Sequence, residues 1–259
     1  MLRRAPCDKV GHPAPGSYYT GEVPHPLNSI PADRIRLIVF DLDGTLIDSR
    51  RDLTNSINAM LAEFGRDPLP EEIIATYIGD GAGMLVRRAL GDPEDEALVE
   101  NALRHFLEHY REHKLDYTRA YPGVMESLEA LRTMPDGTPR KLAVLTNKPV
   151  RASVEICDGL GLSRYMFRIY GGNSFATKKP DPEGLNAIIR EAEAAPGETL
   201  MVGDSSVDIL TARRAGAWAI GCRFGLSSHT VESIPCDCLV DSAGEWAEVL
   251  SLEPDAKPR

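Results

Sequence analysis

The chain lacks the features that mark secreted, membrane-spanning and nucleic-acid-binding proteins. Its 259 residues include five cysteines without a paired spacing, which argues against a disulfide framework and predicts a reduced, cytoplasmic protein. No apolar run approaches the ~20 residues of a membrane span, and residues 1–30 contain no apolar segment typical of a signal peptide. With 39 acidic and 29 basic residues, the net charge of −10 argues against a broad basic surface. We therefore expect no membrane and no nucleic-acid partner.

Alternating apolar and helical segments make up most of the chain. The apolar content of 42% is sufficient for a substantial core. Helical patterns alternate with strand-like apolar runs, which recur near 36–41, 141–146, 167–171, 199–204, 217–222 and 238–240; the helices are expected at 123–133, 149–160, 182–194 and 206–215. This alternation predicts an α/β fold with a parallel sheet and helices on both faces. Ligands of such sheets bind beyond the carboxyl ends of the strands.

The most informative segment, residues 37–49, reads Leu-Ile-Val-Phe-Asp-Leu-Asp-Gly-Thr-Leu-Ile-Asp-Ser. Four apolar residues suit a buried strand, and Asp41 and Asp43 follow it on a tight turn with Gly44. Two carboxylates so close repel each other, and a cation between them relieves the repulsion. The segment therefore predicts a metal-binding or catalytic Asp pair, with a simple turn as the alternative.

Three further segments place polar groups after apolar strand-like runs. Thr146 and Asn147 can donate hydrogen bonds to a phosphoryl oxygen. Lys179 begins a Lys-Pro-Asp-Pro run, whose prolines stiffen a loop that can hold an ammonium in place. Asp204 ends a strand and is expected to act like an N-cap, with Asp208 in the first or second turn of the following helix.

In their residues and in their order along the chain, these four segments resemble the motifs of the haloacid dehalogenase-like (HAD) superfamily, and the resemblance extends from about residue 34 to residue 243. It implies a Rossmann-like parallel-sheet core in which the first core strand lies between the second and the fourth, together with an inserted all-helical cap of the C1 type. The expected organisation is an irregular extension over 1–30, a core over 31–51 and 119–250, a cap over 52–118 and a tail over 251–259.

The resemblance also implies a phosphatase that depends on Mg²⁺ and works through an aspartyl-phosphate. Asp41 is then the nucleophile, Asp43 the general acid and base, and Thr146 and Lys179 stabilise the phosphoryl group. The expected metal ligands are Asp41, Asp43 through its backbone carbonyl, Asp204 and Asp208. The candidate substrate-binding residues are Gly44, Thr45, Asn147, Gly79, Gly81 and Arg87.

A charge count supports a divalent cation at this site. The four aspartates and a phosphate dianion bring more negative charge than Lys179 and one Mg²⁺ can neutralise. The remaining deficit predicts a raised pKa for one carboxyl group, which suits a general acid.

The inserted segment of about 65 residues is expected to form four helices and no strand. These are a helix that begins with a Ser49/Asp52 capping box and ends at Gly65, helices over 70–78 and 83–90, and a longer one from after Pro93 to about Leu115. Such a cap excludes water and selects the substrate. Its hinge is expected near 49–52 and 117–121.

Residues 77–90 resemble the cap loop and helix of phosphoglycolate phosphatases, with a flexible linker as the alternative reading. Asp80 departs from the Asn that is usual there. An acidic group facing an anionic substrate is unfavourable unless Arg87 or Arg88 offsets it.

Two other patterns are expected to be structural. His105, His109 and His113 recur every four residues, a spacing that can bind Zn²⁺, but a solvated helix face is the favoured interpretation. Cys157 and Cys222 are expected to pack in the core.

The sequence therefore predicts a phosphomonoesterase for a small anionic phosphoester, with 2-phosphoglycolate as the expected substrate and a monomer or homodimer as the assembly. A phosphatase for a sugar phosphate or pyrophosphate and a β-phosphoglucomutase-like phosphotransferase remain alternatives, and a non-enzymatic binding module is disfavoured. Phosphonatase chemistry is disfavoured because residues 52–113 contain no lysine, and 2-haloacid dehalogenase chemistry because Asp43 is present.

Overall fold

The computed structural model describes residues 30–250. The predicted tail over 251–259, and the predicted extension over 1–30 apart from Ile30, lie outside the described residues. Within residues 30–250, no helix combines the length and the apolarity that a bilayer span requires.

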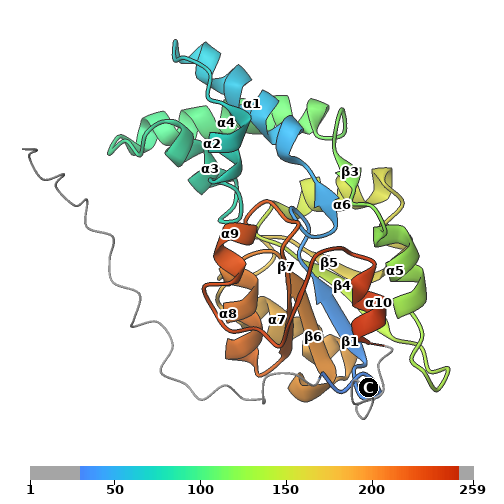
Figure 1. The fold of residues 1–259 in the computed structure, drawn as a ribbon. Helices are drawn as coiled ribbons and strands as arrows, with labels where there is room; N and C mark the ends of the chain where they lie inside the picture. The colour runs from blue at the N-terminus through green and yellow to red at the C-terminus, as the bar shows by residue number, and fades with distance from the viewer. Residues whose placement is uncertain (1–29, 251–259) are drawn as a thin grey trace, which may run out of the picture.

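A six-stranded sheet with the order β5-β4-β1-β6-β7-β8 forms the core (Figure 1). All neighbouring strands pair in parallel. The strands are β1 Leu37–Phe40, β4 Lys141–Leu145, β5 Met166–Tyr170, β6 Thr199–Gly203, β7 Trp218–Cys222 and β8 Cys238–Val240. The prediction of an α/β fold with the first core strand between the second and the fourth is confirmed.

Both faces of this sheet are covered, which is why its strands are continuously apolar rather than alternating. In β1, Ile38 and Phe40 pack into one hydrophobic cluster, whereas Leu37 and Val39 pack into another. The first cluster contains residues of α5 (Val124–Leu131), α6 (Val150–Gly159) and α10 (Glu245–Val249), and the second contains residues of α7 (Glu183–Ala192), α8 (Ser206–Ala215) and α9 (Ser228–Val231). Two short 3₁₀ helices, η1 (Ser163–Tyr165) and η2 (Pro196–Glu198), precede β5 and β6.

Four helices inserted between β1 and β4 form the cap, and Figure 1 shows them beyond the carboxyl ends of the core strands. They are α1 Arg50–Glu63, α2 Glu71–Ala75, α3 Ala82–Ala89 and α4 Glu96–His113. Helix α2 is shorter than the predicted 70–78, because the amides of Thr76, Tyr77 and Ile78 bond to carbonyls three residues back instead of four.

The connections between core and cap contain a two-stranded antiparallel sheet that the sequence did not reveal. It pairs β2 (Ile47–Asp48) with β3 (Arg119–Ala120). Strands of two residues are too short to produce a readable periodicity.

The predicted capping box at the start of α1 is wrong. Ser49 occupies the N-cap position, but its side chain makes no capping hydrogen bond. The carboxylate of Asp52 accepts hydrogen bonds from the amides of Tyr117 and Thr118 and from the Thr118 hydroxyl, at 2.8–3.0 Å. Asp52 therefore ties the two chain crossings between core and cap together, and this long-range contact replaces the local cap.

Candidate active site

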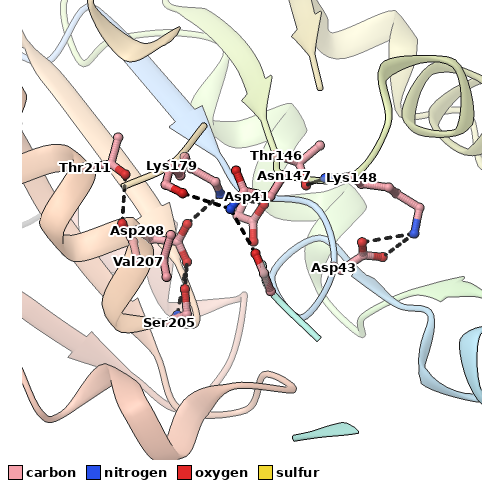
Figure 2. A network of polar contacts seen from close by, with 11 residues as sticks. Asp41, Asp43, Thr146, Asn147, Lys148, Lys179, Ser205, Val207, Asp208 and Thr211 are labelled. Atoms are coloured by element: carbon pink, nitrogen blue, oxygen red, sulfur yellow. Dashed lines mark hydrogen bonds and ion pairs between the residues drawn. The ribbon is translucent and has the colours of Figure 1, made fainter. Parts of the chain in front are cut away.

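The sequence-predicted motif residues converge at the carboxyl ends of three neighbouring strands. Asp41 directly follows β1, Thr146 follows β4 and Asp204 follows β6. Asp208 lies in the first turn of α8, and Lys179 lies on the loop before α7. Figure 2 shows Lys179 between Asp41 and Asp208, with Thr146 close by. The parallel sheet thus gathers groups that lie up to 167 positions apart in the sequence.

Three buried carboxylates form one cluster: Asp41, Asp204 and Asp208 each offer an oxygen within 4.8 Å of the others. Lys179 Nζ lies 2.8 Å from Asp41 Oδ1 and 2.6 Å from Asp208 Oδ1. A single ammonium among three carboxylates leaves two negative charges uncompensated. Such a deficit in a buried site calls for a cation or for protons.

The cluster is held rigid by donors from loops and a helix end. Asp208 Oδ2 accepts from the backbone amide of Ser205 at 3.1 Å and from its hydroxyl at 2.6 Å. Asp204 Oδ2 accepts from the amide of Ser227 at 2.8 Å. Ser205, and not Asp204 as the sequence suggested, is the N-cap residue of α8, because Asp204 is turned towards the carboxylate cluster and Ser227.

Burial shifts the protonation of these groups. The pKa of Asp41 is raised to about 6, chiefly because burial disfavours the charged form; Lys179 partly opposes the shift and Asp208 adds to it. The pKa of Asp204 is raised well above its usual value by burial and by Asp208 and Asp41. Burial alone would lower the pKa of Lys179, but the charges of Asp208 and Asp41 raise it overall.

The donor set of the cluster fits a hard divalent cation. Carboxylate oxygens are the ligands that Mg²⁺ and Ca²⁺ prefer, and two uncompensated charges match a dication. The side chain of Asp43 does not belong to the cluster, so only a backbone carbonyl contribution from this residue stays predicted.

Asp43 instead forms a buried ion pair with Lys148, a residue to which sequence reasoning gave no role. Lys148 Nζ lies 3.0 Å from each oxygen of the Asp43 carboxylate. The Ser49 hydroxyl donates to Asp43 Oδ1 at 2.5 Å. Burial alone would lower the pKa of Lys148, but Asp43 and Tyr110 together raise it overall. The sequence did offer a signal for a role of Lys148. This lysine belongs to a Thr-Asn-Lys-Pro run that follows a buried strand, and it comes directly after the predicted Thr-Asn pair.

The turn after β1 is packed against the carboxylate cluster. Gly44 has a φ of +89°, and a Cβ at this position would lie 2.1 Å from Asp204 Oδ2, so no side chain fits there. The amides of Gly44 and Thr45 donate to Ile47 and Leu42 inside the turn. These two amides therefore already have acceptors inside the turn, and substrate binding by Gly44 and Thr45 stays a prediction. The Thr45 hydroxyl is buried without a hydrogen-bond partner in the described chain.

The cap reaches the site through the loop between α2 and α3. The Asn147 side-chain amide donates to the carbonyls of Gly79 and Lys179, at 3.0 Å each. The Ser227 hydroxyl donates to the carbonyl of Ile78 at 3.1 Å. Gly81 has a φ of +89°, and a Cβ there would lie 2.9 Å from the carbonyl oxygen of Asn147. Gly79, Gly81 and Asn147 thus lie next to one another, and Asn147 uses its amide group to hold the cap; their role in substrate binding stays a prediction.

Arg87, a predicted substrate-binding residue, does not reach the site. Its guanidinium lies 2.5 Å from Glu96 and donates to the carbonyl of Pro93. The neighbouring Arg88 pairs with Asp80 at 2.5 Å, so the unusual acidic residue of the cap loop is compensated within the cap. Successive helical residues point about 100° apart, and the sequence alone did not fix which face of α3 meets the core.

A cavity of about 50 Å³ lies between cap and core. The core contributes Asp41, Asp43, Thr146, Asn147 and Lys148. The cap side chains that line it are Leu53, Ile78, Ala82, Leu85, Phe106, Leu107 and Tyr110. Polar groups thus gather on the core side, and the cap side is almost entirely apolar.

The patterns expected to be structural are accounted for. His109 Nδ1 lies 3.0 Å from the Ser56 hydroxyl, and His113 Nδ1 lies 2.8 Å from Asp116. Within residues 30–250, the histidines of α4 do not join any cluster of metal-ligating groups. Cys157 and Cys222 are buried and unpaired, which confirms their assignment to the core.

Comparison with known proteins gives this geometry a family. The model of the haloacid dehalogenase-like hydrolases matches residues 38–222. The chain is 37% identical over 220 residues to phosphoglycolate phosphatase of Chromobacterium violaceum, covering 83% of this chain and 96% of that protein. It is 41% identical over 196 residues to phosphoglycolate phosphatase 1 of Pseudomonas aeruginosa, covering 73% and 70% respectively.

Solved structures agree with the sequence relatives. A crystal structure described as a predicted phosphoglycolate phosphatase, from Haemophilus somnus, superposes with a TM-score of 0.76 at 32% identity and covers 83% of this chain and 98% of that one. The motifs, the sheet order and these relatives lead to one conclusion: the chain belongs to the haloacid dehalogenase-like hydrolase family and is related within it to phosphoglycolate phosphatases.

Proposed function

We propose that the protein is a Mg²⁺-dependent phosphomonoesterase that hydrolyses 2-phosphoglycolate through an aspartyl-phosphate on Asp41. The observation that carries the proposal is the position of Asp41. Its carboxylate follows β1, contacts Lys179 at 2.8 Å, belongs to the carboxylate cluster and lines the cavity between cap and core.

In the first chemical step, an Asp41 oxygen forms a bond to phosphorus while the bond to the ester oxygen of the substrate breaks. The leaving oxygen takes a proton from the carboxyl group of Asp43, which lines the same cavity. Lys179 and the Thr146 hydroxyl stabilise the charge on the equatorial phosphoryl oxygens. The alcohol product is glycolate.

In the second step, a water molecule attacks phosphorus and the bond to Asp41 breaks. Asp43, now a carboxylate, accepts the proton of that water, which returns both aspartates to their starting states and releases inorganic phosphate. Asp41, Asp204 and Asp208 would hold Mg²⁺, which supplies positive charge against the phosphoryl oxygens when bound.

The cavity supports a small substrate over a sugar phosphate. A sugar presents several hydroxyl groups that need hydrogen-bond partners once they are buried. Leu53, Leu85, Phe106 and Leu107 offer none from the cap side. A leaving group of two carbons suits a cavity of about 50 Å³.

The test is a phosphate-release assay of the full chain with 2-phosphoglycolate, β-glucose-1-phosphate and pyrophosphate, each with Mg²⁺ or with EDTA. We expect the highest kcat/KM for 2-phosphoglycolate, no turnover in EDTA, and a loss of roughly 10⁴-fold or more in Asp41→Asn. Asp136→Asn, which changes an exposed loop carboxylate, is the matched control and should remain fully active. Isomerisation of the sugar phosphate without phosphate release would replace the proposal by phosphotransfer, and full activity of Asp41→Asn would refute the nucleophile.

A further inference from the structure

We propose that Lys148 and Tyr110 form a subsite for a carboxylate on the leaving group, and that this carboxylate replaces Asp43 as the partner of Lys148. The inference rests on the proposed function and assigns the residues that would distinguish an anionic two-carbon leaving group from a neutral one.

The first observation is the position of Lys148 relative to the two ammonium groups of the site. Lys179 already contacts Asp41 and Asp208 on the phosphoryl side. Lys148 is 6% exposed, lines the cavity and contacts Asp43, and Figure 2 shows this pair on the side of Asp41 opposite to Asp208. The positive charge of Lys148 therefore lies next to the group proposed to protonate the leaving oxygen.

The second observation is an unpartnered hydroxyl beside this ammonium. Tyr110 is 3% exposed and lines the same cavity, and its hydroxyl, which lies beside the Lys148 ammonium, has no acceptor for its proton within residues 30–250. Its ring centroid lies 4.7 Å from Lys148 Nζ. Buried hydroxyl groups rarely stay without a partner, because losing water without replacement is unfavourable. An acceptor bound between Lys148 and Tyr110 would supply the missing partner.

The third observation is that the two arginines of α3, a cap helix that contributes to the cavity, are paired elsewhere. Arg87 pairs with Glu96, and Arg88 pairs with Asp80. Neither arginine lines the cavity, and the remaining cap side chains there are apolar. Among the described residues, Lys148 is thus the one cationic side chain that lines the cavity.

Because of these contacts, a negative charge on the leaving group would cause Lys148 to exchange its partner Asp43 for the carboxylate of the substrate. The leaving oxygen must lie beside Asp43, so a carboxylate on the adjacent carbon comes next to Lys148. Two carboxylates then compete for one ammonium, and a displaced Asp43 side chain stays in the cavity that Asp41 also lines. A neutral leaving group carries no charge that competes for Lys148, so Asp43 keeps its partner.

The experiment compares 2-phosphoglycolate with ethyl phosphate, in which a methyl group replaces the carboxylate. Both are assayed with Mg²⁺ on the wild-type chain, Lys148→Met, Tyr110→Phe and the control Lys141→Met. Lys141 is the first residue of β4, the strand that precedes Lys148, and its ammonium donates to the carbonyl of Ala192 at the end of α7. We expect wild type and Lys141→Met to prefer 2-phosphoglycolate by kcat/KM. Lys148→Met should lose roughly 10- to 100-fold on 2-phosphoglycolate and much less on ethyl phosphate, and Tyr110→Phe should lose up to roughly 10-fold with the same selectivity.

Equal losses on both substrates in Lys148→Met would overturn the subsite, because Lys148 would then act only on Asp43. A wild-type enzyme that hydrolyses both esters equally well would overturn it too, even if Lys148→Met failed to fold, while leaving the phosphatase proposal intact. A wild type that releases phosphate from neither ester would instead refute the proposed function and the subsite together.

Discussion

The crowding of Asp41, Asp204 and Asp208 predicts an unusual dependence of stability on pH in the metal-free protein. Burial raises the pKa of Asp41 to about 6 and that of Asp204 well above its usual value. Both groups therefore bind a proton more tightly in the folded than in the unfolded chain. Ionisation of Asp41 lowers the free energy of unfolding above pH 6, and its protonation restores this free energy as the pH falls below 6; Asp204 acts in the same direction.

The magnitude follows from the shift of Asp41. A rise from 3.8 to about 6 is worth about 3 kcal/mol in full, at ~1.4 kcal/mol for each pKa unit. Only about 1 kcal/mol of this is recovered between pH 7 and pH 5, because pH 5 lies only about one unit below the pKa of the folded carboxyl; the rest is recovered as the pH falls from 5 towards 3.8. Asp204 adds a contribution of the same sign.

The assay is urea unfolding at pH 7 and pH 5, each with EDTA and with saturating Mg²⁺. Protons and the metal compete for the same oxygens, so the increment in unfolding free energy that Mg²⁺ confers should be larger at pH 7 than at pH 5. Burial and His113 lower the pKa of His109, so the free energy of unfolding falls as the pH falls through this range. Because His109 lies in the cap, this contribution is the same with and without Mg²⁺ and cancels in the Mg²⁺ increment. In Asp204→Asn the metal increment should largely vanish.

A Mg²⁺ increment that is the same at both pH values would refute this reasoning. It would show either that the three carboxylates are not the metal site or that their protonation is not coupled to folding. An increment retained in Asp204→Asn would lead to the first of these conclusions.

Three further predictions concern the connection of cap and core. Asp52→Ala should lower the free energy of unfolding by about 2–3 kcal/mol, measured by urea titration, since it leaves buried donors including the Thr118 amide unsatisfied; an effect below ~0.5 kcal/mol would contradict the tie across the hinge. Gly81→Ala should lower kcat/KM, because the left-handed backbone and a carbonyl oxygen 2.9 Å from the new Cβ oppose cap closure; unchanged kinetics would show that the loop adapts. Ser227→Ala should raise KM by roughly 2- to 10-fold through the lost bond to Ile78, with an unchanged Mg²⁺ requirement because the amide of residue 227 still reaches Asp204; a weakened Mg²⁺ response would contradict this separation.

The sequence was sufficient for the features that depend on local patterns. The apolar run of β1 ends at Asp41, and the topology of a parallel sheet then places Asp41, Thr146 and Asp204 at one edge. Helix α8 was predicted over 206–215, as observed, although the sequence suggested Asp204 and not Ser205 as its N-cap residue.

Contacts between distant residues were not readable in the same way. Lys148 lies 105 positions from its partner Asp43, and a lysine after a strand looks the same in sequence whether it is solvated or buried. The pairing of Arg87 with Glu96 depends on the rotation of α3 about its own axis, which packing decides and the sequence does not show. Asp52 was assigned to a local cap because its true partners, Tyr117 and Thr118, lie beyond the whole cap.

The way in which the core holds the cap loop has an evolutionary consequence. Asn147 and Ser227 both grip main-chain carbonyls, those of Gly79 and Ile78. Every amino acid presents the same carbonyl, so the attachment at Ile78 depends on the path of the chain and not on its side chain, whereas the φ of +123° at Gly79 favours glycine. Mutations that diversify the cap interior can therefore accumulate without detaching the cap, and new substrate preferences can arise while the catalytic residues of the core stay the same.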